Sequence, residues 1–361
     1  MAVRARVNVL VLNPGSSTLK YAVYGAPASA GAPLLSGLVD KVGPGEMPRA
    51  TVEAIGKSGG NEIEAVGCRV VHGGSRFVDP VRVDDDVLDS IRELSELAPL
   101  HNPLAVQVIE EVRRSLPNVP VVAVFDTAFH KTLPPVAMYA VPPELRIRRY
   151  GFHGISYSYI AGRLHRERMI VCHLGNGSSI CAIRDGKSID TSMGLTPMEG
   201  LVMGTRAGDL DPGAILLLMR GGRSESELDD LLNHRCGLLG VSGRSMDVRE
   251  LEKAAGEGDE RSALALEMFA YRVAKYVAAY VAALGGLDAL VFTAGIGEHS
   301  ASMRRQICSR LGFLGLQLDP ALNDEPRKDE RRISSGPVDI WVIPTNEELE
   351  IARATAAACY S

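Results

Sequence analysis

The sequence lacks the cysteine spacings that disulfide frameworks and zinc sites require. Its six cysteines are scattered over 361 residues, and no two of them form a Cys-x-x-Cys pair. We interpret them as free or buried thiols of a reducing compartment. The N-terminal apolar run, residues 7–12, is interrupted by Asn8 and is too short for a signal peptide. The protein is therefore expected in the cytoplasm.

The sequence also lacks an excess of basic charge and a long uninterrupted apolar run. Lys and Arg together number 39 and Asp and Glu 44, which gives a formal net charge of −5. Nucleic acids and anionic membranes are therefore not expected as partners, whereas a small anionic ligand needs only a few arginines in one place. The longest apolar stretch, 262–284, contains Glu267, Arg272 and Lys275, so it does not suit a membrane span.

Several common catalytic and nucleotide-binding motifs are missing as well. Gly56-Lys57-Ser58 and Gly186-Lys187-Ser188 resemble the end of a Walker A loop, but the glycine required five residues earlier is absent in both. The Gly-x-Gly turns at 175–177 and 295–297 lack the third glycine of a dinucleotide fingerprint. No HExxH or GxSxG motif occurs. A P-loop NTPase, a Rossmann dehydrogenase and an α/β-hydrolase are therefore disfavoured.

A strand–turn–strand pattern is present, and it occurs twice. An aliphatic run, a Gly/Ser turn and a second apolar run cover 7–12, 13–18 and 19–24 in the first half, and 169–174, 175–179 and 180–184 in the second. Aligning Gly15-Ser16-Ser17 with Gly177-Ser178-Ser179 places strand over strand. This match predicts an internal duplication, and two similar halves facing each other would form a cleft.

The remaining patterns indicate a mixed α/β protein of about two domains. Further strands are predicted at 65–71, 120–125, 289–292 and 340–343, and helices at 84–97, 103–115, 156–166, 212–219, 225–233 and 262–284. The loop at 191–211 is long for a compact domain, and loops of that length are usually functional.

The two Gly/Ser turns suit phosphate binding. A tight turn of this kind directs backbone N–H groups and hydroxyls into one concavity. An ordinary polar hairpin is the alternative for each turn alone, but Lys20 after the first and His173 before the second favour phosphate. A third glycine-rich turn, 293–298, follows a predicted strand and opens a helix, where a helix N-terminus suits a nucleotide.

Two arginines, one histidine and two acids stand in contexts that suggest chemistry. Arg69 lies within a predicted strand and Arg206 in the long loop, and a guanidinium suits carboxylate or phosphate. Surface salt bridges are the alternative for both arginines, and a structural role is the alternative for His153. Asp126 and Glu347 follow predicted strands, where carboxylates either hold magnesium through water or cap the strand end.

Motifs along nearly the whole chain resemble the acetate kinase family. They are NPGSSTLK at 13–20, RVVHGG at 69–74, APLHNP at 98–103, FDTAFH at 125–130, YGFHG at 150–154, HLGNG at 173–177, MGLTPMEG at 193–200, TRAGD at 205–209, TAGIGE at 293–298 and PTNEE at 344–348. Their order also matches, which makes the resemblance specific. One departure is His299, because the family commonly has asparagine there.

The resemblance implies a duplicated actin-like ATPase fold of the ribonuclease H-like α/β class, with two domains and an interdomain active-site cleft. The expected domains are 1–149 with a C-terminal helix at 348–361, and a nucleotide-binding domain at 150–347. The implied reaction is reversible transfer of the ATP γ-phosphoryl group to acetate, giving acetyl phosphate and ADP. It implies Mg²⁺, or Mn²⁺, and a homodimer.

The resemblance also implies roles for particular residues. The catalytic residues would be Arg69, Asp126, His153 and Arg206, with Asp126 beside the acetate. The acetate site would comprise Arg69, Val71, Leu100, Phe152 and Pro197. Asn13 and Glu347 would lie on the metal side. The nucleotide would contact Ser16, Thr18, Lys20, His173, Asn176, Gly177, Asp247, Val248, Arg249, Gly295, Ile296, Gly297 and His299.

Two alternatives stay open at this point. One is a propionate kinase, and the other is a non-catalytic or weakly hydrolysing ATPase switch of the actin type. Such a switch needs no acid pocket, yet Arg69, Leu100 and Arg206 occur in the kinase contexts. The kinase chemistry also agrees with the residues, because both reactants are anions and phosphoryl transfer depends mainly on positioning and electrostatic stabilisation.

Overall fold

The computed structural model describes residues 7–15, 17–26, 32–59 and 62–360, and it divides into two compact units. Unit 1 comprises Met1–Lys131, Phe152–Tyr159 and Asn346–Ser361, and unit 2 comprises Thr132–Gly151 and Ile160–Thr345. Unlike the two ranges expected from the sequence, 132–149 lies in unit 2 and 152–159 in unit 1. Hydrogen bonds account for this, because Thr132 Oγ1 donates to Ser188 O at 2.7 Å in unit 2 and Gly154 N donates to Asp126 O at 2.8 Å in unit 1.

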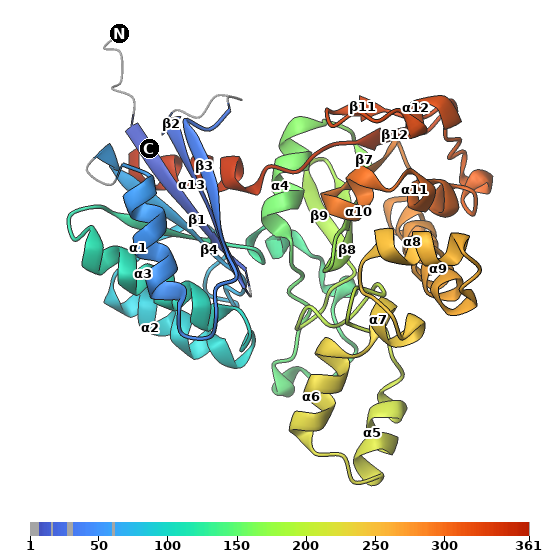
Figure 1. The fold of residues 1–361 in the computed structure, drawn as a ribbon, viewed down its shortest axis with the longest axis horizontal. Coiled ribbons are helices and arrows are strands. Elements are labelled where there is room, and N and C mark those ends of the chain that lie inside the picture. The colour runs from blue at the N-terminus through green and yellow to red at the C-terminus, as the bar shows by residue number, and fades with distance from the viewer. Residues whose placement is uncertain (1–6, 16, 27–31, 60–61, 361) are drawn as a thin grey trace. The chain divides into compact units, whose positions relative to one another are not determined.

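Unit 1 is built on a six-stranded mixed sheet in the order β3-β2-β1-β4-β6-β5 (Figure 1). The strands are β1 (Val7–Pro14), β2 (Thr18–Ala26), β3 (Leu35–Asp40), β4 (Ala65–Val70), β5 (Val81–Arg82) and β6 (Val121–Phe125). The first three form an antiparallel meander, β4 and β6 run parallel to β1, and β5 is antiparallel to β6.

Both faces of this sheet are buried, as the apolar run at residues 9–12 of β1 requires. Side chains alternate along a strand, so Leu10 and Leu12 face one apolar cluster while Val9 and Val11 face another. The helices α1 (Met47–Lys57), α2 (Asp85–Glu93) and α3 (Asn102–Ser115) cover the first face, and α13 (Glu347–Tyr360) covers the second. Gly67 permits the close approach of α13, because a Cβ there would overlap Thr355 Oγ1.

Unit 2 repeats the same topology. Its sheet has the order β11-β12-β10-β7-β8-β9, formed by β7 (Arg168–Leu174), β8 (Ser178–Arg184), β9 (Lys187–Thr191), β10 (Ala289–Thr293), β11 (Arg331–Arg332) and β12 (Asp339–Val342). An antiparallel meander is again followed by two parallel strands and one antiparallel edge strand. The duplicated fold predicted from the sequence is therefore confirmed.

The residue-by-residue alignment of the two turns was wrong by two positions. β1 ends at Pro14, which pairs with Leu19, and β7 ends at Leu174, which pairs with Ser178. Gly15 therefore corresponds to Gly175, the first residue after β7, and not to Gly177. The error arose because similar letters were aligned, whereas strand pairing decides where each turn begins.

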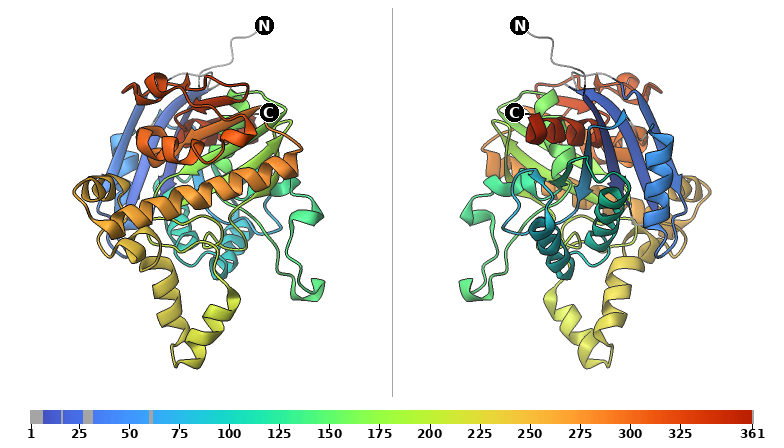
Figure 2. Two further views of the ribbon diagram at one scale, coloured as in Figure 1. Left: turned by 90° about the vertical axis from the view of Figure 1, so that its right-hand side faces the viewer. Right: turned by 90° about the vertical axis from the view of Figure 1, so that its left-hand side faces the viewer.

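A long helix packs on the unit 2 sheet and explains the apolar stretch found in the sequence. The helix α9 (Glu260–Leu284) buries Phe269, Val273 and Val277, which repeat every four residues, and it runs across one side of the unit in Figure 2. The other helices are α4 (Gly154–Arg163), α5 (Pro212–Arg220), α6 (Glu225–His234), α7 (Gly237–Ser242), α8 (Val248–Gly256), α10 (Ala294–His299), α11 (Ala301–Cys308) and α12 (Pro320–Asp324). None of the helices formed by the described residues has the length and apolar character needed to cross a membrane.

Candidate active-site residues

A partly buried polar group lies in unit 1 at the carboxyl ends of β1, β4 and β6 and the start of α13. We call it the Arg69 group: Asn13, Arg69, Asp126, Glu347 and Glu348. Arg69 donates to Asp126 Oδ2 through Nε at 2.9 Å and through Nη2, and its Nη1 donates to Asn13 Oδ1 at 3.3 Å. Asn13 Nδ2 donates to Glu347 Oε2 at 3.3 Å and to Glu348 Oε1 at 3.0 Å. The parallel strands and the start of α13 therefore bring together residues separated by more than 300 positions in the sequence.

The electrostatics of the Arg69 group favour a ligand. Asp126 is 1% exposed, and its Oδ1 is buried with no hydrogen-bond partner among the described residues. Burial raises the pKa of the Asp126 carboxyl, the Arg69 guanidinium lowers it, and the Glu347 carboxylate raises it further, so the net shift is upward. Burial lowers the pKa of Arg69, but Asp126 and Glu347 more than offset this. A buried oxygen without a partner points to a donor or cation that comes from a ligand, an ion or water.

His153 stands in a strained backbone conformation beside Asp126. Its φ of +57° lies in the left-handed region, which histidine rarely adopts. The next residue, Gly154, donates its N–H to Asp126 O at 2.8 Å, and a Cβ at this position would overlap that same oxygen. Glycine is therefore required here for α4 to begin directly against the end of β6.

His72, next to the predicted acetate-side residue Val71, contacts Phe152 and Asn102 in the interior of unit 1. Val71 and Phe152 are buried, whereas Leu100 is 41% exposed. The backbone of His72 exchanges two hydrogen bonds with the Asn102 side chain, at 3.1 and 3.0 Å, which ties the end of β4 to the start of α3. The His72 ring contacts the Phe152 ring edge-on, with centroids 5.5 Å apart.

Arg206 and Pro197, which the resemblance also assigned to the site, belong to the 192–211 loop of unit 2. Arg206 Nη1 donates to Pro197 O at 2.6 Å. No carboxylate within the described residues forms an ion pair with Arg206, and burial lowers its pKa to about 10. The guanidinium therefore stays charged at neutral pH, and an incoming anion would supply the counter-charge that the chain does not provide.

A network that the sequence analysis missed holds this loop in place. Arg149 donates to the carbonyl oxygens of Thr191 and Met193, each at 3.1 Å, and to Glu199 Oε1 at 2.7 Å. The hydroxyl of Tyr139 donates to Glu199 Oε2. The only signal in the sequence was the position of Arg149 beside the 150–154 motif, and it did not reveal partners some forty residues away.

A pocket of about 470 Å³ in unit 2 gathers most of the predicted nucleotide-binding residues. Its lining comprises Gly175, Asn176, Met246, Asp247, Val248, Arg249, Glu252, Gly295, Ile296, His299 and Ser300. Seven of these were predicted, while Gly175, Met246, Glu252 and Ser300 were not. The lining does not include His173, Gly177 or Gly297. Thr18 and Lys20 lie on β2 of unit 1, and Ser16 lies outside the described residues.

Local structure explains how the pocket walls form. Asp247 is the N-cap of α8, where its Oδ1 accepts from Arg249 N at 2.8 Å, and its Oδ2 accepts from Arg249 Nη2 at 2.6 Å. The Arg249 hydrogen bond lowers the pKa of Asp247. Arg304, which does not line the pocket, is 1% exposed and donates to Gly297 O at 2.9 Å and to Glu298 O at 3.0 Å, which anchors α10.

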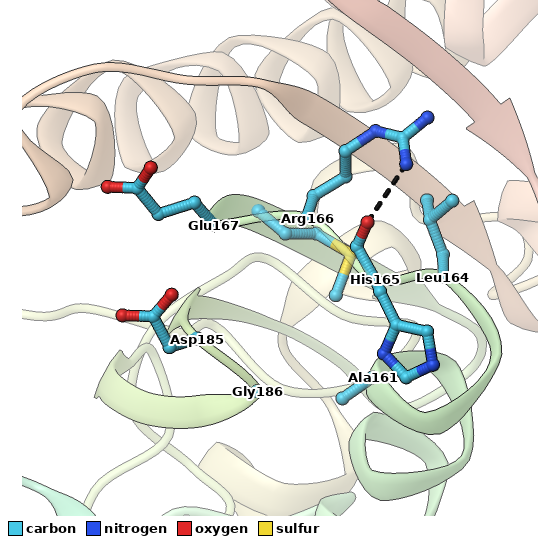
Figure 3. A pocket seen from close by; sticks show the side chains of 8 residues that line it. Ala161, Leu164, His165, Arg166, Glu167, Asp185 and Gly186 are labelled. Carbon is cyan, nitrogen blue, oxygen red and sulfur yellow. Dashed lines mark hydrogen bonds between the residues drawn. The ribbon is translucent and has the colours of Figure 1, made fainter.

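A second hollow in unit 2, of about 510 Å³, contains no predicted site residue (Figure 3). It lies where β7 begins, at the end opposite to the Gly175 turn. The Glu167 and Asp185 carboxylates point to one side of it, and His165 lies across from them in Figure 3. Arg166 donates to the His165 carbonyl at 2.9 Å and to Asp339 at 3.0 Å, so its charge is already paired.

The donors of the Arg69 group suit a magnesium ion that arrives with a nucleotide. No set of three or more His, Cys, Asp or Glu side chains arranged for a metal occurs in the described part of the chain. Nucleotide-bound Mg²⁺ does not need such a set, since it usually takes one or two carboxylates together with phosphate oxygens and water. Glu347 and the unpartnered Asp126 Oδ1 provide carboxylate oxygens of this kind.

Comparisons with known proteins identify relatives over almost the entire chain. Residues 51–353 match the model of the acetokinase family. The acetate kinases of Heliobacterium modesticaldum and Dictyoglomus turgidum are 48% and 46% identical to this chain, and the alignments cover 96% and 97% of it and 98% and 97% of the relatives. Among solved structures, Porphyromonas gingivalis acetate kinase superimposes with a TM-score of 0.88 at 39% identity, covering 98% of this chain and 99% of that one. A propionate kinase from Francisella tularensis superimposes with a TM-score of 0.90 at 40% identity, covering 97% and 99%.

Proposed function

Because the chain belongs to the acetokinase family, we propose that it catalyses the reversible transfer of the ATP γ-phosphoryl group to acetate, giving acetyl phosphate and ADP. The observation that carries this proposal is the near-complete match to relatives named acetate kinase, at 46–48% identity. Arg206, which forms no ion pair with the described carboxylates, and the unit 2 pocket support it, since they provide an anion site and a nucleotide-sized cavity.

Electrostatic stabilisation is the main contribution that the protein makes in this proposal. The acetate carboxylate is already ionised at neutral pH, so the reaction needs no general base. Arg69 and Arg206 bind the acetate and the transferring phosphoryl group, and His153 contacts that phosphoryl group. Asp126 fixes the guanidinium of Arg69 through two hydrogen bonds to Oδ2, which leaves Oδ1 for the ligand side. Its role is orientation rather than proton transfer.

The nucleotide is held by unit 2 in this proposal. The adenosine occupies the pocket between Asp247–Arg249 and Gly295–His299, and the Gly175 turn with Asn176 and Gly177 binds phosphate. Thr18 and Lys20, which follow the first Gly/Ser turn on β2 of unit 1, also contact phosphate in this proposal. Asn13, Asp126 and Glu347 would hold Mg²⁺, or Mn²⁺, which offsets the negative charge of the phosphates when bound.

Hydroxylamine trapping tests the proposed function. Purified protein is incubated with ATP, Mg²⁺ and hydroxylamine, together with acetate, propionate or no acid, and acyl hydroxamate is measured. We expect acetyl hydroxamate to form fastest. Faster propionyl hydroxamate would favour propionate kinase, the alternative supported by the Francisella tularensis structure. Slow ATP hydrolysis that is the same with and without acid, and no hydroxamate, would favour the ATPase switch.

The proposal includes a cytoplasmic location and a homodimer. All six cysteines are free thiols, as a reducing compartment would keep them. Exposed apolar side chains gather on three segments of unit 2, and Figure 2 shows the first two projecting from it. They are Val136, Val141, Leu145 and Ile147 in 132–149, Leu216, Leu217 and Met219 in α5, and Leu264, Met268 and Tyr271 in α9. Exposed apolar side chains that lie together on a surface mark interaction sites.

The charges of these segments are complementary to each other, which favours a second copy of the chain as the partner. The α6 helix, which follows α5, carries Glu225, Glu227, Asp229 and Asp230, whereas segment 132–149 carries Arg146 and Arg148. In a two-fold dimer the acidic α6 of each copy can face the basic 132–149 segment of the other copy. The same charge pairing then occurs twice.

Sedimentation equilibrium tests the homodimer. We expect a mass of twice 38.6 kDa for the wild type and a shift toward monomer in the Leu216→Glu, Leu217→Glu double variant. Phe313→Glu is the matched control, because Phe313 is 77% exposed but lies outside the three segments. A monomeric wild type at micromolar concentration would contradict the proposal.

A further inference from the structure

His130 is a buried histidine to which the proposed mechanism gives no role. It lies in unit 1 in the single 3-10 turn Ala128–Thr132 that follows Asp126, and only 1% of it is exposed. Its Nε2 lies 3.0 Å from the carbonyl oxygen of Phe152. A carbonyl oxygen only accepts hydrogen bonds, so Nε2 carries the hydrogen and donates it.

The Phe152 carbonyl belongs to the peptide that leads into His153, and a hydrogen bond holds each of the two peptides that flank His153. On the N-terminal side, His130 holds Phe152 O, and on the C-terminal side, Asp126 O holds Gly154 N at 2.8 Å. Between these two hydrogen bonds, His153 has its left-handed φ of +57°. Strain of this kind persists only where surrounding contacts impose it.

Aromatic packing fixes the His130 ring itself. Phe129 and Tyr157 lie edge-on to it, with ring centroids 5.8 and 5.6 Å away. Tyr157 is fully buried on α4, the helix that begins directly after His153. The ring therefore connects the end of β6, which carries Asp126, to the start of α4.

We propose that His130 is a positioning residue for His153: its hydrogen bond to Phe152 O maintains the left-handed backbone that sets the direction of the His153 side chain. This inference rests on the proposed function, in which His153 contacts the transferring phosphoryl group. His130 acts through the backbone and touches no reactant.

A double-mutant cycle tests the proposal. His130→Phe keeps the ring volume but loses the donor, and we expect kcat to fall by roughly 10- to 100-fold, as a small displacement of a catalytic group can cause. The KM for ATP should change less than about twofold, because His130 lies outside the unit 2 pocket. In a His153→Ala background, His130→Phe should reduce kcat less than about twofold further. His130→Gln, which restores an amide donor, should recover most of the lost activity.

Phe129→Leu is the matched control, since it removes one ring contact to His130 and leaves the hydrogen bond in place. We expect it to retain kcat within about threefold, as a surface-side packing change does. Equal losses from His130→Phe in the wild-type and His153→Ala backgrounds, or an unchanged kcat in His130→Phe, would overturn the proposal. Should His130→Phe not fold, His130→Met takes its place in the same cycle with the same expectations.

A second measurement does not depend on the proposed function. The imidazole resonances of the eight histidines can be recorded by NMR, and His153 can be assigned from its loss in His153→Ala. We expect the His153 resonance to shift in His130→Phe and to stay in place in Phe129→Leu. An unmoved resonance would refute the positioning role, even in a protein that lacks acetate kinase activity. A shifted resonance in a protein without that activity would contradict the proposed reaction and leave the positioning role of His130 supported.

Discussion

Arg206→Lys is expected to lower kcat on the order of 10²-fold or more, with the KM for ATP changed less than about twofold. Lysine keeps the positive charge but loses the planar fork, so it cannot hold Pro197 O with one nitrogen and present further N–H donors to a phosphoryl group. The structure makes the loss severe, because Arg206 is largely desolvated, has no ion pair with a described carboxylate, and so leaves its positive charge for a ligand.

Arg69→Lys should have a comparable effect for a related reason. The guanidinium of Arg69 forms three hydrogen bonds at once, two to Asp126 Oδ2 and one to Asn13 Oδ1. A lysine ammonium is a single point donor and would release at least one of these partners, which leaves a buried carboxylate poorly compensated. Acetate binding should weaken together with kcat in this variant.

Initial-rate kinetics with both substrates varied is the measurement for the two arginines. Arg235→Lys and Arg76→Lys are the matched controls, one in each unit, because both arginines form exposed ion pairs with aspartates. Exposed pairs contribute little, so the controls should retain near-normal kinetics. Near-normal turnover in both Arg206→Lys and Arg69→Lys would show that these arginines are structural.

The fold was largely predictable because each sheet depends on local apolar runs. Residues 9–12 of β1, 169–172 of β7 and 289–292 of β10 are continuous apolar segments, and a strand buried on both faces needs such a run. The equivalence of Gly15 with Gly175 was not predictable, because the position of a turn depends on which residues of neighbouring strands pair. The division into units could not be predicted from sequence patterns either. Hydrogen bonds of Gly154 and Thr132 decide to which unit each segment belongs.

The contacts within the candidate site were likewise only partly predictable from the sequence. Asn176, Asp247 and Ile296 were proposed through the family resemblance, and the structure brings them together around one pocket from three distant segments. The periodicity of apolar residues alone could not have predicted that these three residues lie close together. Arg149 and His130 were missed because each acts on backbone carbonyls far away in the sequence, and no spacing rule relates a side chain to such a partner. The left-handed backbone at His153 was likewise invisible to sequence patterns.

Val71→Ala is expected to raise kcat/KM for propionate relative to acetate by roughly 10- to 200-fold, the range available to one methylene. Burying an extra methylene normally gains about 0.8 kcal/mol, so a preference for acetate must come from steric exclusion. Val71 is 7% exposed, directly follows β4, and is next to His72, whose ring contacts Phe152. Its branched side chain has a stiff χ1 and cannot turn aside for a longer acid.

The ratio of the two specificity constants, measured for the wild type and the variant, checks this expectation. Val70→Ala is the matched control, because Val70 precedes Val71 in the chain but is fully buried in the apolar cluster beneath the sheet. It should lose stability, by about 0.5–3 kcal/mol, while the ratio stays unchanged. A wild type that already prefers propionate would assign the protein to propionate rather than acetate. An unchanged ratio in Val71→Ala would mean that Leu100, Phe152 or Pro197 limits the acid instead, because the extra methylene would then still meet the same obstacle.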